Sequence, residues 1–203
     1  MSMPVITLAA EGLIDIAVCR RIAFESGFEP GNEYGGHGKS KLDERLNGYN
    51  AAAMRTPWLV ARDMDHDGRC PGALVAKLLP SPSQLICFRI AVRTIESWLL
   101  ADCEAFSERF SVTEAQLPRL PEQLENPKQF MLALLFRSRS REVLATMVHE
   151  AGDGALRVGA QYNSTFSHFA GHEWRPEIAA VRAGSLRASL RRLAELRKKL
   201  KNS

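Results

Sequence analysis

The fold is decided by Thr56-Pro57-Trp58-Leu59-Val60-Ala61-Arg62-Asp63-Met64-Asp65-His66-Asp67-Gly68, in which a short apolar run ends in three alternating aspartates and a glycine. Residues 58–61 are predicted to be a buried strand, because a brief β-prone run between a proline and a turn cluster is too short for a helix. The aspartates then follow the carboxyl end of a strand, where open α/β sheets place their ligands. Clustered carboxylates repel one another, so a cation among them is expected.

An earlier acidic position repeats this layout. The apolar run Val5 to Ala10 is predicted to be a first buried strand, and it ends at Glu11-Gly12. The helical periodicity of residues 13–25 follows. Glu11 is therefore expected at the same sheet edge, with Asp15 one helical turn further on the same face. Asp15 suits metal ligation and, equally, interaction with the helix N-terminal dipole.

The rest of the first half alternates helices and strands. Helices are expected over residues 41–54, 72–79 and 91–104, and a further strand over residues 85–90. Such alternation predicts an α/β fold with a mostly parallel sheet flanked by helices. The glycine-rich residues 29–40 are predicted to be a loop. Its Gly38-Lys39-Ser40 is no phosphate-binding P-loop, because Glu33 stands where that motif needs glycine, although Lys39 can still approach a phosphate.

Strand patterns fade after Phe106. A proline-rich connector is expected over residues 117–127, a helix interrupted by basic residues over 128–149, an irregular segment over 150–167 and an amphipathic helix over 176–200. The domain prediction is accordingly an α/β unit over residues 1–105 and a mainly helical C-terminal extension over residues 106–203.

Composition narrows the class of protein. The chain has 203 residues, 45% of them apolar and 25% charged, which is typical of a folded globular protein. No apolar run approaches the roughly 20 residues of a membrane helix, and no secretory leader pattern is present, so a cytoplasmic protein without membrane contact is expected. The four cysteines are widely spaced, which favours reduced, buried thiols over disulfides or zinc.

Charge is unevenly distributed. Residues 182–201 hold eight basic residues and one acid, a net +7, which leaves about −3 for the rest of a chain whose total is +4. A basic helix face of this kind suits salt-dependent contact with nucleic-acid phosphates, and Arg191, Arg192 and Lys198 are the predicted contacts. The same helix also suits a homodimer contact or a solvated surface.

Two motif families share the pattern Asp-x-Asp-x-Asp-Gly. An EF-hand calcium loop needs glutamate at its twelfth position, where this chain has Leu74. The better match pairs Glu11-Gly12 with residues 63–68, and it resembles the Toprim domain of type II topoisomerases, primases, OLD-type nucleases and small stand-alone nucleases. Residues 89–102, Trp174-Arg175-Pro176 and Ser185-Leu186 also look like bacterial stand-alone Toprim proteins.

The resemblance implies a function in phosphoryl transfer. Glu11 and the aspartates would hold Mg²⁺ (or Mn²⁺), and this cation would neutralise charge on the phosphate. The implied metal ligands are Glu11, Asp15, Asp63, Asp65 and Asp67, and the implied catalytic residues are Glu11, Asp63, Asp65 and Glu96. Lys39 and Arg93 would join the basic helix in binding nucleic acid. The alternative for Arg93 and Glu96, which their helical spacing favours, is a surface ion pair.

These residues predict a metal-dependent nuclease acting on DNA or RNA, in phage defence or a mobile element as the relatives suggest. Strand passage is excluded because the chain has no room for a tyrosine nucleophile domain, and any ATPase partner would be a separate chain. The alternatives are a non-catalytic nucleic-acid-binding or regulatory protein of the same fold and a metal-dependent phosphatase acting on small substrates.

Overall fold

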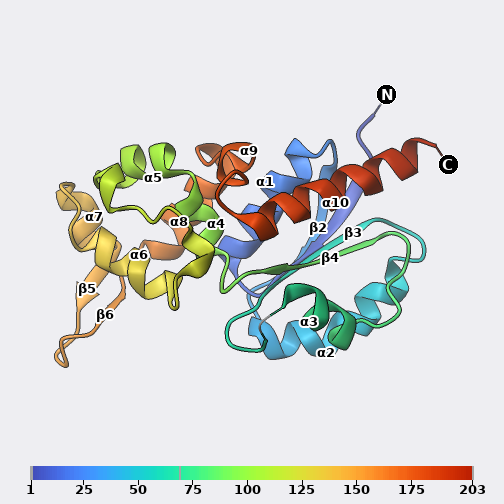
Figure 1. The fold of residues 1–203 in the computed structure, drawn as a ribbon, viewed down its shortest axis with the longest axis horizontal. Helices are drawn as coiled ribbons and strands as arrows, with labels where there is room; N and C mark the ends of the chain where they lie inside the picture. The colour runs from blue at the N-terminus through green and yellow to red at the C-terminus, as the bar shows by residue number, and fades with distance from the viewer. Residues whose placement is uncertain (1, 69, 203) are drawn as a thin grey trace.

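A computed structural model describes residues 2–68 and 70–202. Within them, four strands form an all-parallel sheet in the order β2-β1-β3-β4, and two short strands form a separate antiparallel pair. The predicted α/β class with helices flanking a parallel sheet is therefore confirmed (Figure 1). The strands are β1 (Val5–Ala9), β2 (Glu29–Tyr34), β3 (Trp58–Asp63), β4 (Ile86–Ala91), β5 (Val148–Glu150) and β6 (Leu156–Val158).

Helices cover both faces of the sheet and make up most of the second half of the chain. They are α1 (Leu13–Glu25), α2 (Gly38–Ala52), α3 (Pro71–Leu78), α4 (Glu96–Ala101), α5 (Cys103–Phe110), α6 (Pro127–Leu135), α7 (Arg141–Thr146), α8 (Tyr162–His172), α9 (Pro176–Ala179) and α10 (Gly184–Lys201), with 3₁₀ helices η1 (Glu114–Gln116) and η2 (Pro121–Gln123). Within residues 2–68 and 70–202, none of these helices combines the length and apolarity needed to span a membrane.

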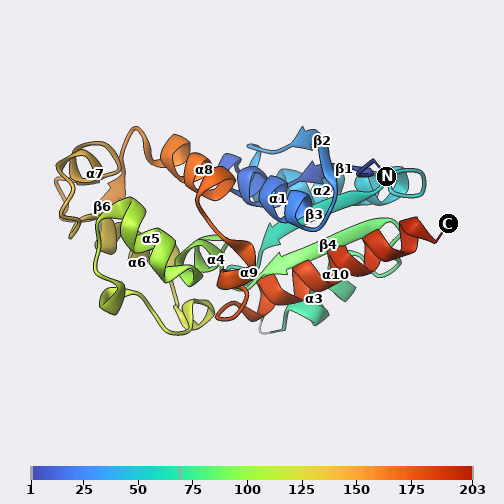
Figure 2. The same ribbon diagram turned by 90° about the horizontal axis from the view of Figure 1, so that it is seen from above.

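Alternation along the strands builds two apolar layers. In β3, Leu59 and Ala61 belong to the cluster beneath α1 and α10, whereas Trp58 and Val60 belong to the cluster beneath α2 and α3. Successive strand residues point to opposite faces, so a strand buried on both sides is apolar throughout. Figure 1 shows α1 and α10 above the sheet and α2 and α3 below it, and in Figure 2, seen from above, α1 and α10 lie in front of the sheet.

The glycine-rich segment differs from its prediction. Residues 29–34 form the edge strand β2, paired in parallel with β1, rather than a loop. Its residues are mostly exposed and include Pro30 and Gly31, so it lacks the β-branched, buried pattern by which strands are recognised. Proline is tolerated there because an edge strand leaves some backbone amides unpaired.

The predicted helix over residues 91–104 is also divided. β4 continues to Ala91, Arg93 takes a left-handed backbone conformation (φ 61°), and α4 begins only at Glu96. Asp102 then separates α4 from α5 and caps α5 by accepting a hydrogen bond from the Ala105 amide. The capping carboxylate satisfies a backbone donor at the start of the new helix.

Buried tryptophans join the helical half to the sheet. The Trp98 indole donates to Ser185 Oγ (2.8 Å), and the Trp174 indole donates to the Trp98 carbonyl (3.1 Å). Arg175 donates to the fully buried carboxylate of Asp102 at 2.6 and 2.9 Å. These contacts fix α4 against α10 and thereby position Glu96 at the sheet edge.

The apolar cluster beneath α1 continues into the helical half, where it includes Phe110, Phe166 and Phe169. In Figure 1, α10 leaves the helical half and returns across the sheet. Both halves therefore contribute to one continuous core. The predicted boundary near residue 105 stays a prediction.

Candidate functional site

A cavity of about 460 Å³ lies at the carboxyl edge of the parallel sheet. Five acidic side chains line it, from the ends of two strands, β1 and β3, and from the helices α1 and α4. Because parallel strands present their carboxyl ends at one edge, residues distant in sequence meet there. The lining residues are Glu11, Gly12, Leu13, Ile14, Asp15, Gly36, Asp63, Asp65, Thr94, Glu96, Lys128 and Asn163.

Glu11 and Asp63 are held by backbone amides. Glu11 Oε1 accepts a hydrogen bond from the Asp63 amide (2.9 Å), and Asp63 Oδ1 accepts one from the Ile95 amide (2.9 Å). These contacts link the ends of β1, β3 and β4. The second carboxylate oxygen of each residue has no hydrogen-bond partner among the described residues, so each is available to a ligand.

Burial makes this cluster costly when its members are ionised. It is the largest of the effects that together raise the pKa of Glu11 to about 7; the negative charges of Asp15 and Asp65 act in the same direction, and the Asp63 amide opposes them. It also raises the pKa of Asp15 to about 6, with Glu96 adding to the effect. The pKa of Asp63 is raised well above its usual value by burial and then by the surrounding acids. A cation in the cavity would relieve this repulsion.

Asp65 and Asp67 have different surroundings. Lys39 Nζ lies 2.7 Å from Asp65 Oδ2 and 3.2 Å from Asp67 Oδ2. Arg62, which is 4% exposed, donates to Asp67 Oδ2 at 2.6 Å and forms a two-pronged pair with Asp43. Hydrogen bonding to Arg62 lowers the pKa of Asp67. These two aspartates are thus neutralised by the protein's own cations.

The glycine-rich turn places Lys39. The amides of Gly36 and Gly38 both donate to the Glu11 carbonyl, at 3.1 and 3.0 Å. Both glycines have positive φ, 82° and 74°, which other residues adopt at a cost. A Cβ on Gly35 would lie 2.5 Å from an Ile16 side-chain carbon. The turn therefore packs closely on β1 and α1 and positions the start of α2 beside the acidic edge of the sheet.

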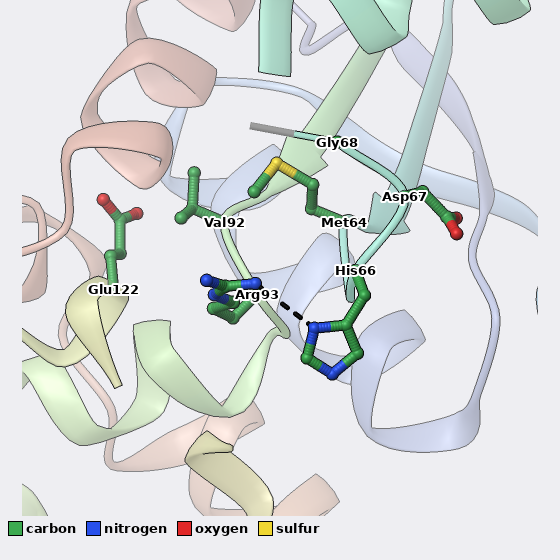
Figure 3. Close-up of a pocket in the computed structure, with 7 residues that line it drawn as sticks. All are labelled: Met64, His66, Asp67, Gly68, Val92, Arg93 and Glu122. Atoms are coloured by element: carbon green, nitrogen blue, oxygen red, sulfur yellow. Dashed lines mark hydrogen bonds between the residues drawn. The ribbon is translucent and has the colours of Figure 1, made fainter. Parts of the chain in front are cut away.

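A second cavity, of about 630 Å³, lies beside the turn after β3. Figure 3 shows Arg93 and His66 side by side there, with the Asp67 carboxylate directed away from both. Arg93 Nη1 lies 3.4 Å from His66 Nδ1 and donates to the Asp65 carbonyl (3.1 Å). Glu122 reaches the opposite wall of this cavity from η2 (Figure 3). Arg93 thus precedes α4 and lies outside it, and the described contacts include no Arg93–Glu96 pair.

The structure brings some of the predicted acids together in one cavity and places others beside basic residues or in the second cavity. Glu11, Asp15, Asp63 and Glu96 share one cavity, and Glu96 is 8% exposed. Asp15 also lies in the first turn of α1, so both interpretations of it still apply. Asp65 lines the same cavity but pairs with Lys39, and Asp67 lines the second cavity. The metal-ligand roles of all five implied ligands stay predictions.

The predicted nucleic-acid contacts on α10 lie elsewhere. Ser185 Oγ accepts from the Val92 amide, and further along the helix Ser189 Oγ accepts from Arg89. α10 therefore runs antiparallel to β4, away from the acidic edge. At about 1.5 Å per residue, Lys198 lies roughly 20 Å along the helix from Ser185. Arg191 and Arg192 lie between them and share Glu195 as an ion-pair partner.

Sequence reasoning missed three residues of the cavity. Lys128 comes from the start of α6 and Asn163 from α8, both in the helical half, and Thr94 follows β4. Lys128 lowers the pKa of Asp15 in opposition to burial. Thr94 Oγ1 is buried without a hydrogen-bond partner among the described residues. No local motif marks Lys128 or Asn163, because tertiary packing alone brings them to the acids.

The donor chemistry of the cavity fits a divalent cation. Carboxylate oxygens, the unpartnered Thr94 hydroxyl and the Asn163 amide are the hard oxygen donors that Mg²⁺ and Mn²⁺ prefer. The ligand geometry is not formed, since no three His, Cys, Asp or Glu side chains within residues 2–68 and 70–202 stand close enough to hold a metal ion.

Comparisons with protein-family models, curated proteins and solved structures found no match.

Proposed function

We propose that this chain is a Mg²⁺- or Mn²⁺-dependent nuclease that hydrolyses phosphodiesters of DNA or RNA at a Toprim-like acidic site. A cytoplasmic location and a role in phage defence or a mobile element are part of the proposal, through the resemblance of Glu11-Gly12 and residues 63–68 to that family.

The observation that carries the proposal is the convergence of Glu11, Asp15, Asp63 and Glu96 on one cavity. Four carboxylates facing a shared space are costly without a cation, as the raised pKa values of Glu11, Asp15 and Asp63 express. In a binding site, the favourable interaction with the ligand offsets this energetic cost. We include in the proposal that the cation draws these carboxylates inward.

Each side chain then has a role that follows from its position. Asp63 and Glu11 would hold the cation through the oxygens that the backbone amides leave unpaired. Glu11 serves either as a ligand or as the acceptor of a proton from the attacking water. Lys39 and Lys128 flank the acids and would donate to phosphate oxygens. When bound, the cation neutralises negative charge that develops on the phosphate.

The test is cleavage by the purified full chain. Supercoiled plasmid and single-stranded RNA are incubated with Mg²⁺ or Mn²⁺, and nicking or shortening is followed on gels. We expect Glu11→Gln and Asp63→Asn each to lower the rate on the order of 100-fold, because each removes a charged donor from the cation. Glu44→Gln is the matched control, since Glu44 is an exposed acid paired with Lys41 on α2.

The result also separates the alternatives. Binding of nucleic acid without cleavage under any of these conditions would overturn the nuclease proposal in favour of the non-catalytic, regulatory function. Turnover of a chromogenic phosphoester without salt-sensitive binding of nucleic acid would favour the small-molecule phosphatase.

A further inference from the structure

The acids at the sheet edge form two sets with different charge balance. The first set shares one cavity and consists of Glu11, Asp15, Asp63 and Glu96. Lys128, from the helical half of the chain, also lines this cavity. Asp65 and Asp67 instead have Lys39 between them. The first set therefore lacks a positive charge close to each carboxylate, whereas in the second set the Lys39 ammonium contacts both aspartates.

Lys39 occupies the position that a bridging cation would take between two carboxylates. Its Nζ is 2.7 Å from one aspartate oxygen and 3.2 Å from the other, so a single positive centre contacts both. The contacts with Asp65 and Asp67 raise the pKa of Lys39, which keeps the ammonium charged. The Lys39 side chain is 33% exposed and so remains reachable from solvent.

Three further contacts hold this arrangement in place. The Gly36 and Gly38 amides bind the Glu11 carbonyl and fix the start of α2, where Lys39 lies. Arg62 also holds Asp67, at 2.6 Å from Oδ2, the oxygen that Lys39 contacts. A lysine on a free surface loop would lack such supports. Lys39 is instead anchored through the backbone of the same residue, Glu11, whose side chain faces the acidic cavity.

We infer that the acidic edge takes one divalent cation per chain, among Glu11, Asp15, Asp63 and Glu96, and that the ammonium of Lys39 stands in place of a second cation at Asp65 and Asp67. This inference rests on the proposed function and specifies its metal requirement.

The arrangement has a chemical purpose in phosphodiester hydrolysis. A pair of positive centres stabilises charge on both the attacking and the leaving side of the phosphate. Here the protein supplies one of them permanently. An ammonium has three protons. Lys39 donates one of them to Asp65 at 2.7 Å, and Asp67 lies within ion-pair distance at 3.2 Å. A remaining proton is then available to a phosphate oxygen of the substrate.

In the experiment, the full chain is titrated with Mn²⁺ alone, without nucleic acid. Calorimetry and the electron paramagnetic resonance signal of free Mn²⁺ measure how many ions bind. The wild type is compared with Lys39→Met, which keeps the side-chain length and removes the charge. Lys41→Met is the control, because Lys41 lies on the same helix and pairs with exposed Glu44. Circular dichroism checks that each variant is folded.

We expect the wild type and Lys41→Met to bind one Mn²⁺ per chain. Lys39→Met is expected to bind a second, weaker Mn²⁺ at the freed aspartates. Two Mn²⁺ bound by the wild type would overturn the inference and leave the nuclease proposal standing. A Lys39→Met protein that still binds one Mn²⁺ with unchanged affinity would overturn the role of Lys39. Failure of the wild type to bind Mn²⁺ at millimolar concentration would overturn the proposed function itself.

Discussion

Neighbouring residues of β3 serve opposite sides of the sheet. Arg62 extends toward α2, where it pairs with Asp43, while the side chain of Asp63 joins Glu11 and Glu96 in the cavity. This division follows from the two-residue period of a strand. If β3 were shifted by one residue, the Arg62 guanidinium would enter the acidic cavity and the Asp63 carboxylate would face α2. The pairing of β3 with β1 and β4 therefore determines the charge of the site.

The pKa values of Glu11 and Asp15 predict how metal-free protein responds to pH. Both are raised, to about 7 and about 6, so folding favours the protonated carboxyl groups. The stability that these groups contribute is present below pH 4 and is lost as pH rises through 6 and 7. With chelator present, we expect the free energy of unfolding to fall between pH 5 and pH 8, by about 1–2 kcal/mol for Glu11 after allowance for its partial exposure.

Urea unfolding of wild type and Glu11→Gln measures this effect. The variant removes the titrating group, so the difference between the two proteins should change with pH while contributions from other groups cancel. Glu11→Gln should gain on the wild type as pH rises. A difference that is the same at pH 5 and pH 8 would contradict the prediction. Mg²⁺ at pH 8 should stabilise the wild type more than the variant, because binding favours the folded state.

At the level of elements, the break between α4 and α5 is set by one buried side chain. Asp102 is fully buried, caps α5 and accepts two hydrogen bonds from the Arg175 guanidinium. Arg175 also contacts Glu104, which is exposed. The buried contact and the exposed contact thus share one arginine, which allows their contributions to be compared directly.

Replacing Asp102 by alanine is expected to lower the free energy of unfolding by about 2–4 kcal/mol, because the helix cap and the charged hydrogen bonds are lost together. Glu104→Ala should cost under about 1 kcal/mol, since exposed ion pairs contribute little. Chemical denaturation of both variants provides the measurement. Equal losses in the two would show that Asp102 has no special part in joining the halves.

The helices and strands were predictable where pattern and burial agree. The strands around residues 5–9, 58–63 and 86–91 are apolar and buried, and the sequence indicates each of them. β2 was missed because an exposed edge strand has no such pattern. The helix break at Asp102 was missed because it depends on Arg175, far along the chain. Local patterns carry no information about such distant partners.

The same distinction explains the site. Glu11 and Asp63 were found because each directly follows a recognisable strand, and parallel strands share a carboxyl edge. Lys128 and Asn163 were missed because they come from α6 and α8. The pairing of Lys39 with Asp65 was not predicted, since it depends on the conformation of a glycine-rich turn for which the sequence indicated only a loop.

For the whole molecule, the position of α10 separates the predicted nucleic-acid contacts on that helix from the acidic cavity. Replacing Arg191, Arg192 and Lys198 together by alanine should reduce the slope of log affinity against log salt by about 2–3, if each contacts one phosphate. Cleavage of a short oligonucleotide should change little, because a substrate of a few nucleotides does not extend roughly 20 Å along the helix. Fluorescence anisotropy at several salt concentrations gives the slope.

A charge-matched control tests whether position matters. Arg137, Arg139 and Arg141 are exposed between the end of α6 and the first residue of α7, and their replacement by alanine removes the same charge. We expect this triple variant to keep most of the wild-type salt dependence. Equal losses from the two variants would mean that overall charge, and not the α10 surface, attracts the nucleic acid.

The return of α10 across β4 makes the sheet depend on residues that are synthesised near the end of this sequence. Leu186, Leu193 and Leu196 fill the layer beneath the sheet, so a ribosome-bound chain that stops before residue 184 leaves that layer open to water. On a growing chain, this side of the sheet is therefore covered only once residues 184–201 have been added.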